Sequence, residues 1–416
     1  MFFFYSAAQR YPDQVFNPNI RTIKFNIYGD QLGYPIIRLN GNDKLELNFD
    51  DMDPEVKNYF YTFQLCNSDW SPVQMSYFDF VRGFTQVRIS TYRVSSSVLT
   101  RYIHYQATLP DRNCMPTKAG NYILKVFLNG DTTQLAFTRR LLVYDSKLAI
   151  AAQVQQPFTQ QFFRTHHKLQ VAVSTKGVTV TYPNQQIKVV ALQNYRWDNC
   201  IKDIPPLFFR NDMVEYNTEK DFLVAAGKEW RWLNLRSFRL LGDRVQKQTN
   251  TDSTFELYVK PETDRVNQRY YFFRDLNGMF TSETTENVNP FWEAEYAKVH
   301  FTYIPPGNAP YPGKDVYLFG EITNYGMLDS AKMRFNASSG AYETTLKLKQ
   351  GYYDYMYVTK DKADNKSGFS TSFTEGNWWE SEDHYMILVY YRELGGRYDQ
   401  LLGVAQLNSQ FSRPGY

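Results

Sequence analysis

The sequence predicts an all-β protein built from tandem β-sandwich domains of the immunoglobulin-like or early-set type, with few and short helices. Apolar and polar residues alternate with a period of two in many short stretches, and turn residues separate these stretches. No stretch shows a sustained apolar period of 3.6 residues, the pattern that indicates a surface helix. Aromatic residues make up 17% of the chain and charged residues 21%, which excludes a disordered chain and a coiled coil.

Charge and hydropathy exclude two further classes of protein. The 46 Lys and Arg residues nearly balance the 43 Asp and Glu residues, and the net charge of +3 lacks the excess that drives non-specific nucleic-acid binding. No apolar run is long enough for a membrane-spanning helix. We therefore expect a folded protein that binds no nucleic acid and has no direct membrane span.

The first residues have the pattern of the end of a secretory signal peptide. An apolar start is followed by small residues, Ser6 and Ala8, at the −3 and −1 positions of a cleavage site, and the chain then becomes polar. We interpret residues 1–8 as a residual signal peptide, and the alternative is an ordinary apolar N-terminus. In an oxidising compartment, Cys66 and Cys114 either form a disulfide or serve as small buried apolar residues.

Three β-sandwich domains are predicted along the chain. The first covers residues 9–147 and holds about seven short strands, the number that an immunoglobulin-like sandwich requires. Asp145, Ser146 and Lys147 at its end are predicted to form a short linker. Its clearest alternating stretches are 44–49, 59–65, 102–109 and 121–128. We expect each of these strands to bury one face and expose the other.

The second domain is predicted to cover residues 148–300, with strands near 169–174, 186–193, 222–227, 230–241, 254–259 and 269–273. The 230–241 stretch carries Arg236 and Arg239, which lie either on a solvated cationic face or in a stripe that docks an acidic partner.

The third domain is predicted to cover residues 301–416, with strands near 316–320, 342–348, 352–358 and 384–391. The run of Pro and Gly over 305–313 is either a long loop or a domain boundary, and we place the boundary near residue 300.

The sequence contains no recognisable catalytic or cofactor-binding motif. The five histidines are scattered without metal-ligand spacing, and no nucleophile elbow, Walker loop or dinucleotide-binding glycine motif occurs. We therefore predict a protein that is not an enzyme and that uses no metal and no other cofactor.

Pairs of adjacent aromatic residues are the remaining signal for a binding site. Phe162 and Phe163 form one pair, and Trp378 and Trp379 form another. Neighbours on a strand point to opposite faces, so that one member of each pair is expected to be exposed. We name Phe162, Phe163, Trp378, Trp379, Arg236 and Arg239 as candidate partner-contact residues. The two tryptophans also allow stacking on sugar rings.

Three segments resemble one known family. They are residues 58–70 (NYFYTFQLCNSDW), residues 78–84 (FDFVRGF), and residues 119–126 (AGNYILKV) with the strand after it at 138–140. The chain is similar to the type IX secretion system plug protein family, once known only as a domain of unknown function, from about Asn17 to the C-terminal strands. Separately, residues 316–325 (VYLFGEITNY) resemble the opening strand of the early-set sandwich that accompanies glycogen-active enzymes.

The resemblance implies a specific function. Plug proteins of this family are non-enzymatic subunits of the type IX translocon. They bind the periplasmic end of its large outer-membrane β-barrel and close the channel when no cargo is engaged. The resemblance thus implies a periplasmic protein, attached peripherally to the outer-membrane translocon and its associated subunits. The alternative is a periplasmic carbohydrate-binding β-sandwich protein, argued from Trp378, Trp379 and the third domain.

Overall fold

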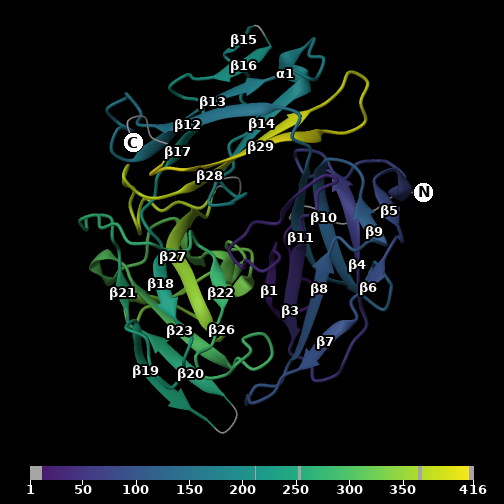
Figure 1. The fold of residues 1–416 in the computed structure, drawn as a ribbon. Helices are drawn as coiled ribbons and strands as arrows, with labels where there is room; N and C mark the ends of the chain where they lie inside the picture. The colour runs from purple at the N-terminus through teal and green to yellow at the C-terminus, as the bar shows by residue number, and fades with distance from the viewer. Residues whose placement is uncertain (1–11, 211, 252–253, 364–367, 412–416) are drawn as a thin grey trace. The chain divides into compact units, whose positions relative to one another are not determined.

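Figure 1 shows the computed structural model of the chain, which describes residues 12–210, 212–251, 254–363 and 368–411. Strands dominate these residues, and the prediction of an all-β sandwich protein with short helices is confirmed. The helical elements are α1 (Pro183–Gln186) and the 3-10 turns η2 (Tyr77–Asp79), η3 (Pro306–Asn308), η4 (Glu321–Thr323) and η5 (Asp329–Ala331). The predicted signal peptide, residues 1–8, lies outside the described residues.

The chain divides into two compact units. Unit 1 holds the described residues up to Val94, together with Arg101–Ser146 and Tyr390–Leu402. Unit 2 holds Ser95–Thr100, Lys147–Val389 and the residues from Gly403 onward. The main change of unit, between Ser146 and Lys147, falls in the stretch that the sequence marks as a linker.

Unit 1 contains a sandwich of two sheets. One sheet has the strand order β1 (Ile20–Ile27), β3 (Leu45–Asp51), β8 (Ile103–Leu109) and β7 (Thr91–Val94). The other has the order β2 (Ile36–Arg38), β11 (Leu135–Tyr144), β10 (Gly120–Leu128), β4 (Tyr59–Cys66) and β6 (Val87–Arg88). A short ladder pairs β5 (Val81–Gly83) with β9 (Cys114–Pro116).

Aromatic residues fill the space between these two sheets. Phe49 of β3 lies with its ring centroid 5.0 Å from that of Phe137 on β11 and 5.1 Å from that of Tyr59 on β4. All three side chains are buried in one hydrophobic core. Burial of large aromatic rings in contact with one another supplies both hydrophobic stabilisation and specific packing.

The prediction that each strand exposes one face is wrong for β3, whose seven residues are all buried. Its polar side chains have partners instead of water: Asp50 Oδ1 lies 2.8 Å from His104 Nδ1, and Asn48 Oδ1 lies 3.1 Å from His104 Nε2. A buried polar row remains stable where such partners exist, because its hydrogen bonds offset the loss of hydration.

None of the three cysteines, Cys66, Cys114 and Cys200, forms a disulfide. Cys66 and Cys114 do not form the disulfide considered as one of two alternatives; both are buried in unit 1. Cys114 Sγ lies 3.4 Å from the Tyr77 hydroxyl, and Cys66 Sγ lies 3.7 Å from the Gln64 carbonyl oxygen. Burial raises the pKa of Cys66 to about 12 and the pKa of Cys114 to about 11.

Unit 2 begins with a sandwich whose strands come from both ends of the unit. One sheet has the order β12 (Ala149–Gln155), β13 (His166–Ser174), β16 (Met213–Tyr216) and β15 (Phe208–Arg210), with β17 (Leu223–Ala225) also on β13. The other has the order β14 (Ile187–Gln193), β28 (His384–Tyr391) and β29 (Gln400–Asn408).

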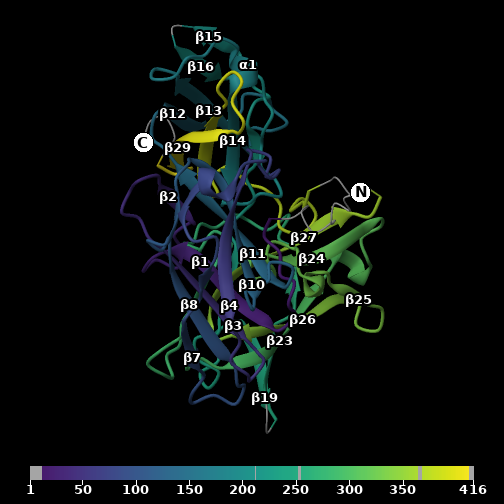
Figure 2. The same ribbon diagram turned by 90° about the vertical axis from the view of Figure 1, so that its right-hand side faces the viewer.

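A second sandwich of unit 2 lies between β17 and β28 in the sequence. In one of its sheets, β27 (Gly351–Asp361) pairs with β18 (Arg231–Asn234), β22 (Phe280–Ser282) and β24 (Lys314–Phe319). Figure 2 shows β24 and β27 side by side, in agreement with their antiparallel register. The other sheet contains β19 (Val245–Asn250), β20 (Phe255–Val259), β23 (Tyr296–Ile304), β26 (Ala341–Lys349) and β25 (Arg334–Asn336), with β21 (Glu262–Thr263) also on β23.

The strand pairing does not follow the predicted division at residue 300. β23 runs through that position and pairs with β20 on one side and β26 on the other. The C-terminal strands β28 and β29 join β14 rather than the sheet of β27. The Pro and Gly run at 305–313 is therefore a loop between β23 and β24, which is one of its two predicted forms. Local turn signals mark strand ends, but they carry no information on which distant strands pair.

Candidate functional site

Two chain segments connect the two sandwiches of unit 2. The first runs from β17 to β18, and the second, residues 371–382, runs from β27 back to β28. The two segments are hydrogen-bonded to each other: Trp378 N donates to the Gly227 carbonyl at 2.7 Å, and Gly227 N donates to Asn377 Oδ1 at 3.1 Å. The predicted contact residue Trp378 thus lies at this crossing.

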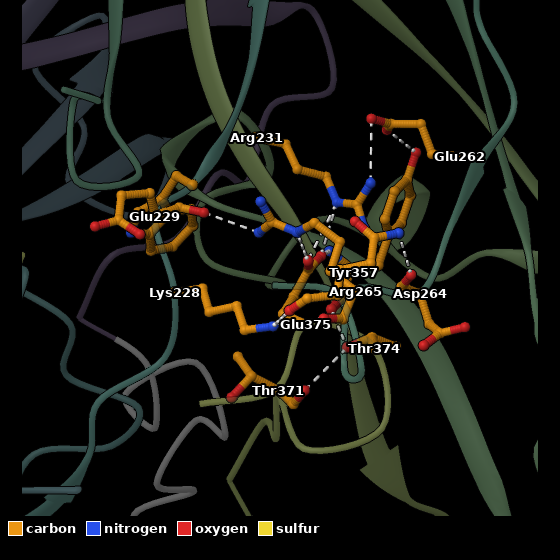
Figure 3. Close-up of polar contacts among 12 residues, drawn as sticks. Lys228, Glu229, Arg231, Glu262, Asp264, Arg265, Tyr357, Thr371, Thr374 and Glu375 are labelled. Atoms are coloured by element: carbon orange, nitrogen blue, oxygen red, sulfur yellow. Dashed lines mark hydrogen bonds and ion pairs between the residues drawn. The ribbon is translucent and has the colours of Figure 1, made fainter. Parts of the chain in front are cut away.

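A buried ion network lies beneath the crossing (Figure 3). Glu375, with none of its side chain exposed, lies with Oε1 3.0 Å from Arg231 Nε and with Oε2 2.5 Å from Arg265 Nε. Arg231 is 4% exposed, and its Nη1 also lies 3.2 Å from Glu262 Oε1. Because Arg231 and Glu375 are both out of water, neither can lose the other without a large electrostatic cost.

The network keeps the Glu375 carboxylate ionised. Burial by itself raises the pKa of this group, but the adjacent Arg231 and Arg265 guanidiniums outweigh burial and lower the pKa to about 2. The backbone N–H of Tyr357 also donates to Glu375 Oε1 at 2.9 Å. The connecting segment is thereby fixed to β27 by a group that stays charged throughout the physiological range.

The same network holds the loop that follows β21. Lys228 Nζ donates to the carbonyl oxygens of Arg265 at 2.5 Å and Gln268 at 3.1 Å. Further along this loop, the Tyr270 hydroxyl lies within hydrogen-bond distance of two acceptors, Glu229 Oε1 and, at 2.9 Å, the Glu380 carbonyl oxygen. The chain from Arg265 to Tyr270 is therefore tied to both connecting segments.

On either side of Tyr270 the loop presents four exposed side chains in all, and we call this stretch the Arg269–Arg274 segment. Tyr271 is 67% exposed and Phe272 54% exposed, and Arg269 and Arg274 are exposed on either side of them. Two inward aromatic rings anchor the segment. The Tyr270 ring is stacked on Trp378 with centroids 6.0 Å apart, and the Phe273 ring meets Trp232 edge-on at 4.8 Å.

The sequence predicted a strand at 269–273, and this prediction is wrong, because the structure has no strand there. Aromatic residues favour strands in general, but here the backbone joins no ladder and side-chain contacts hold it instead. Sequence reasoning consequently missed Tyr271 and Phe272 as surface residues. The available signal was the run Arg-Tyr-Tyr-Phe-Phe-Arg itself, which does not alternate as a half-buried strand does.

The structure brings the two predicted aromatic pairs to neighbouring positions. Trp379 N donates to the carbonyl oxygen of Arg164, the residue after Phe163, at 3.0 Å. Phe163 is 44% exposed, whereas Phe162 is half-buried and packs edge-on against His166 at 4.8 Å.

The two tryptophans are also partly covered. The Trp379 ring lies edge-on to His167, with ring centroids 5.0 Å apart, and Trp378 Nε1 donates to Glu380 Oε2 at 3.1 Å. Both indole rings are therefore committed in part to contacts within unit 2.

The two predicted arginines contact other elements. Arg236 lies past the end of β18, where its guanidinium is 3.5 Å from Glu283 Oε2 and 5.8 Å from the centre of the Tyr352 ring. Arg239 is exposed, and its backbone N–H donates to Glu286 Oε1 at 3.0 Å. The stretch 230–241 is a strand only over Arg231–Asn234, so these arginines do not form a continuous stripe on one strand.

Taken together, the fold and this site define an all-β protein of several sandwiches that carries an aromatic and cationic surface segment. Within the described ranges, no helix has the length and apolar character that a bilayer crossing needs. Nor does any group of three or more His, Cys, Asp or Glu side chains in the described part of the chain have an arrangement that could hold a metal ion.

Residues 20–145 match the family model described as the type 9 secretion system plug protein 1st domain. Over these residues, the predicted resemblance to the type IX secretion system plug protein family is confirmed. This match supports a role in type IX secretion and suggests a structural component located in the cell envelope.

The solved structures that match include one that is similar over nearly the whole chain. It is the crystal structure of a hypothetical protein from Parabacteroides merdae, with 28% sequence identity and a TM-score of 0.91. The similarity covers 95% of this chain and 98% of that one. No curated protein matches the sequence.

Proposed function

We propose that this protein is a non-enzymatic subunit of the type IX secretion translocon. In this proposal it binds the periplasmic end of the large outer-membrane β-barrel and closes the barrel's channel when no cargo is engaged. The observation that carries the proposal is the family match of residues 20–145. The protein acts in the periplasm and attaches peripherally to the translocon and its associated subunits.

Physical considerations support a sealing function. A channel wide enough for folded cargo leaks solutes when it stands open, so that an unoccupied barrel needs a stopper. Packed β-sandwich cores suit this task because close-packed interiors resist deformation. Both units contain such cores, with Phe49 and Phe137 in contact in unit 1 and Phe301 and Tyr355 in contact in unit 2.

The partner contacts belong to the same proposal. Phe163, Trp378 and the exposed part of Trp379 lie close together in unit 2, and aromatic side chains of this kind are enriched in interface hot spots. Phe162, Arg236 and Arg239 stay predicted contact residues. The competing hypothesis, a carbohydrate-binding protein, has weaker support, because Trp378 is stacked on Tyr270 and Trp379 is packed against His167.

Affinity purification tests the proposed partner. Tagged protein is expressed at its native level, envelopes are solubilised in a mild detergent, and the captured proteins are identified by mass spectrometry. We expect the large type IX barrel subunit to be recovered in near-stoichiometric amount. Envelopes from a strain without that subunit serve as the control. Recovery of no barrel, or saturable quenching of tryptophan fluorescence by soluble glucans, would favour the carbohydrate-binding alternative.

A further inference from the structure

The Arg269–Arg274 segment carries two cationic groups that have no anionic partner in the described part of the chain. Among the described residues, neither Arg269 nor Arg274 forms an ion pair with a carboxylate, and the Arg269 guanidinium lies 5.7 Å from the centre of the Tyr271 ring. Most buried arginines of unit 2 behave differently. Arg231 and Arg265, for example, are paired with Glu375.

The nearby acidic groups are already engaged in other contacts. Glu229 is buried and accepts from the Tyr270 hydroxyl, and Glu380 accepts from Trp378 Nε1. Asp275, directly after Arg274, is buried and accepts from the backbone N–H of Trp230 at 2.5 Å and of Asn277 at 2.9 Å. The four exposed side chains of the segment carry two positive charges and no negative charge, although the whole chain is close to neutral.

The segment is also held in a fixed conformation. Tyr270 packs on Trp378, and Phe273 packs on Trp232. The Trp232 ring also contacts Arg244, whose guanidinium lies 3.9 Å from the ring centre. A loop that is ordered before binding loses little conformational entropy when it binds. Exposed Tyr and Phe side chains between two Arg residues have the composition of an interface centre, where aromatic residues and Arg are enriched.

We propose that the Arg269–Arg274 segment is the docking site for an acidic protein segment of the translocon. Carboxylates of the partner pair with Arg269 and Arg274, and an apolar side chain between them packs on Tyr271 and Phe272. Positive charge complementary to carboxylates argues for an acidic occupant, and the two exposed rings argue for a protein, which can offer apolar and anionic groups together. This inference rests on the proposed function, because it names the surface and the chemistry of the same interaction.

The experiment compares three double variants in the full-length protein. R269Q/R274Q removes both charges, and Y271A/F272A removes both exposed rings. K247Q/R334Q is the matched control, because it removes two exposed positive charges from β19 and β25, elsewhere in the second sandwich of unit 2. Thermal unfolding of each variant first establishes that it is folded. Binding to the detergent-solubilised type IX barrel is then measured at low and at high ionic strength.

We expect R269Q/R274Q and Y271A/F272A each to raise the dissociation constant roughly tenfold or more at low salt, as the loss of hot-spot residues does. The salt dependence of binding should flatten in R269Q/R274Q only, because screening acts on the charge pairs. K247Q/R334Q should bind as the wild type does.

The alternative outcomes separate this inference from the proposed function. If the wild type does not bind the barrel at all, the proposed function fails, and the inference fails with it. If the wild type binds and R269Q/R274Q binds equally well, only the inference fails. If R269Q/R274Q loses binding to phosphatidylglycerol vesicles but keeps its affinity for the barrel, the segment recognises a lipid headgroup, and the protein partner named here is wrong.

Discussion

Glu375 and Arg231 are joined in a buried ion pair, with Glu375 Oε1 3.0 Å from Arg231 Nε, although 144 residues separate them in the sequence. Arg231 begins β18, the first strand after the outgoing connection, and Glu375 lies in the returning connection. The pair therefore holds the two connecting segments together at the point where the second sandwich of unit 2 joins the first. The surface with Trp378 and Tyr270 is built on this base.

Substituting Glu375→Gln should strongly destabilise unit 2. The change leaves Arg231 and Arg265 without their shared counter-ion, and removing one partner of a buried pair costs about 3–5 kcal/mol. Urea unfolding monitored by tryptophan fluorescence measures this change in the free energy of unfolding. Glu380→Gln, at an exposed position in the same segment, is the control and should change stability little. Equal stability of the two variants would refute a structural role for the buried pair.

The same pair predicts sensitivity to acid. The folded-state pKa of Glu375 is lowered to about 2, below its usual value of 4.5. A carboxyl group of this kind contributes stability that is fully present above its unfolded-state pKa and is lost as the pH falls toward 2. We expect the melting temperature to fall steeply between about pH 4.5 and pH 2 in the wild type and less steeply in E375Q. Parallel curves for the two proteins would show that another group is responsible.

Asp354 should make the folded state less stable as the pH rises, whereas Glu375 makes it less stable as the pH falls. Burial and the adjacent carboxyl of Asp275 raise the pKa of Asp354 to about 8, while burial and the nearby Glu382 and Glu229 raise the pKa of Asp275 to about 7. A raised carboxyl pKa favours the folded state at low pH, so that this contribution is lost as the pH rises from about 4 to about 8.

The variant Asp354→Asn tests this contribution. Asp354 Oδ2 accepts from the backbone N–H groups of Leu276 and Gly278, and an amide oxygen can accept the same bonds without titrating. At pH 8 we expect the variant to gain roughly 1–3 kcal/mol in free energy of unfolding relative to the wild type. Thermal unfolding over pH 5 to 9 provides the measurement, and an identical pH slope in both proteins would count against a titrating Asp354.

Thiol reactivity tests the burial of the cysteines. Cys66 and Cys114 are buried, and burial raises the pKa of each, so that neither offers a thiolate near neutral pH. Cys200 is partly exposed. Ellman's reagent should modify one thiol in the native protein and three in denaturant, and a Cys200→Ser variant should lose the native reaction. Only one reactive thiol in denatured wild type would instead show that Cys66 and Cys114 are joined by a disulfide.

Local features of the fold could be predicted from the sequence, because they depend on neighbouring residues. The alternating stretch 121–128 is β10, and 352–358 lies within β27. Long-range pairing could not be predicted in this way. β14 and β28 share a sheet although about two hundred residues lie between them, and nothing in either strand identifies the other as its partner.

The candidate site likewise has residues that could be predicted from the sequence and residues that could not. Trp378 and Phe163 could be named from sequence because adjacent aromatic residues are visible there. The base of the site could not, because Arg231, Arg265 and Glu375 are common charged residues whose pairing exists only after folding. Because the sequence predicts a strand at 269–273, Tyr271 and Phe272 are not expected to be exposed on a loop. Strand propensity reflects packing within a sheet, and this loop belongs to no sheet.

The most direct test of the sealing function is the permeability of the outer membrane to a large antibiotic that intact envelopes exclude. Four strains are compared: wild type, a deletion of this protein, a deletion of the type IX barrel, and the double deletion. We predict that uptake rises in the single deletion of this protein and returns to the wild-type level in the double deletion, because only an open barrel can leak. Uptake that stays high after the barrel is removed, or that never rises, would contradict the account.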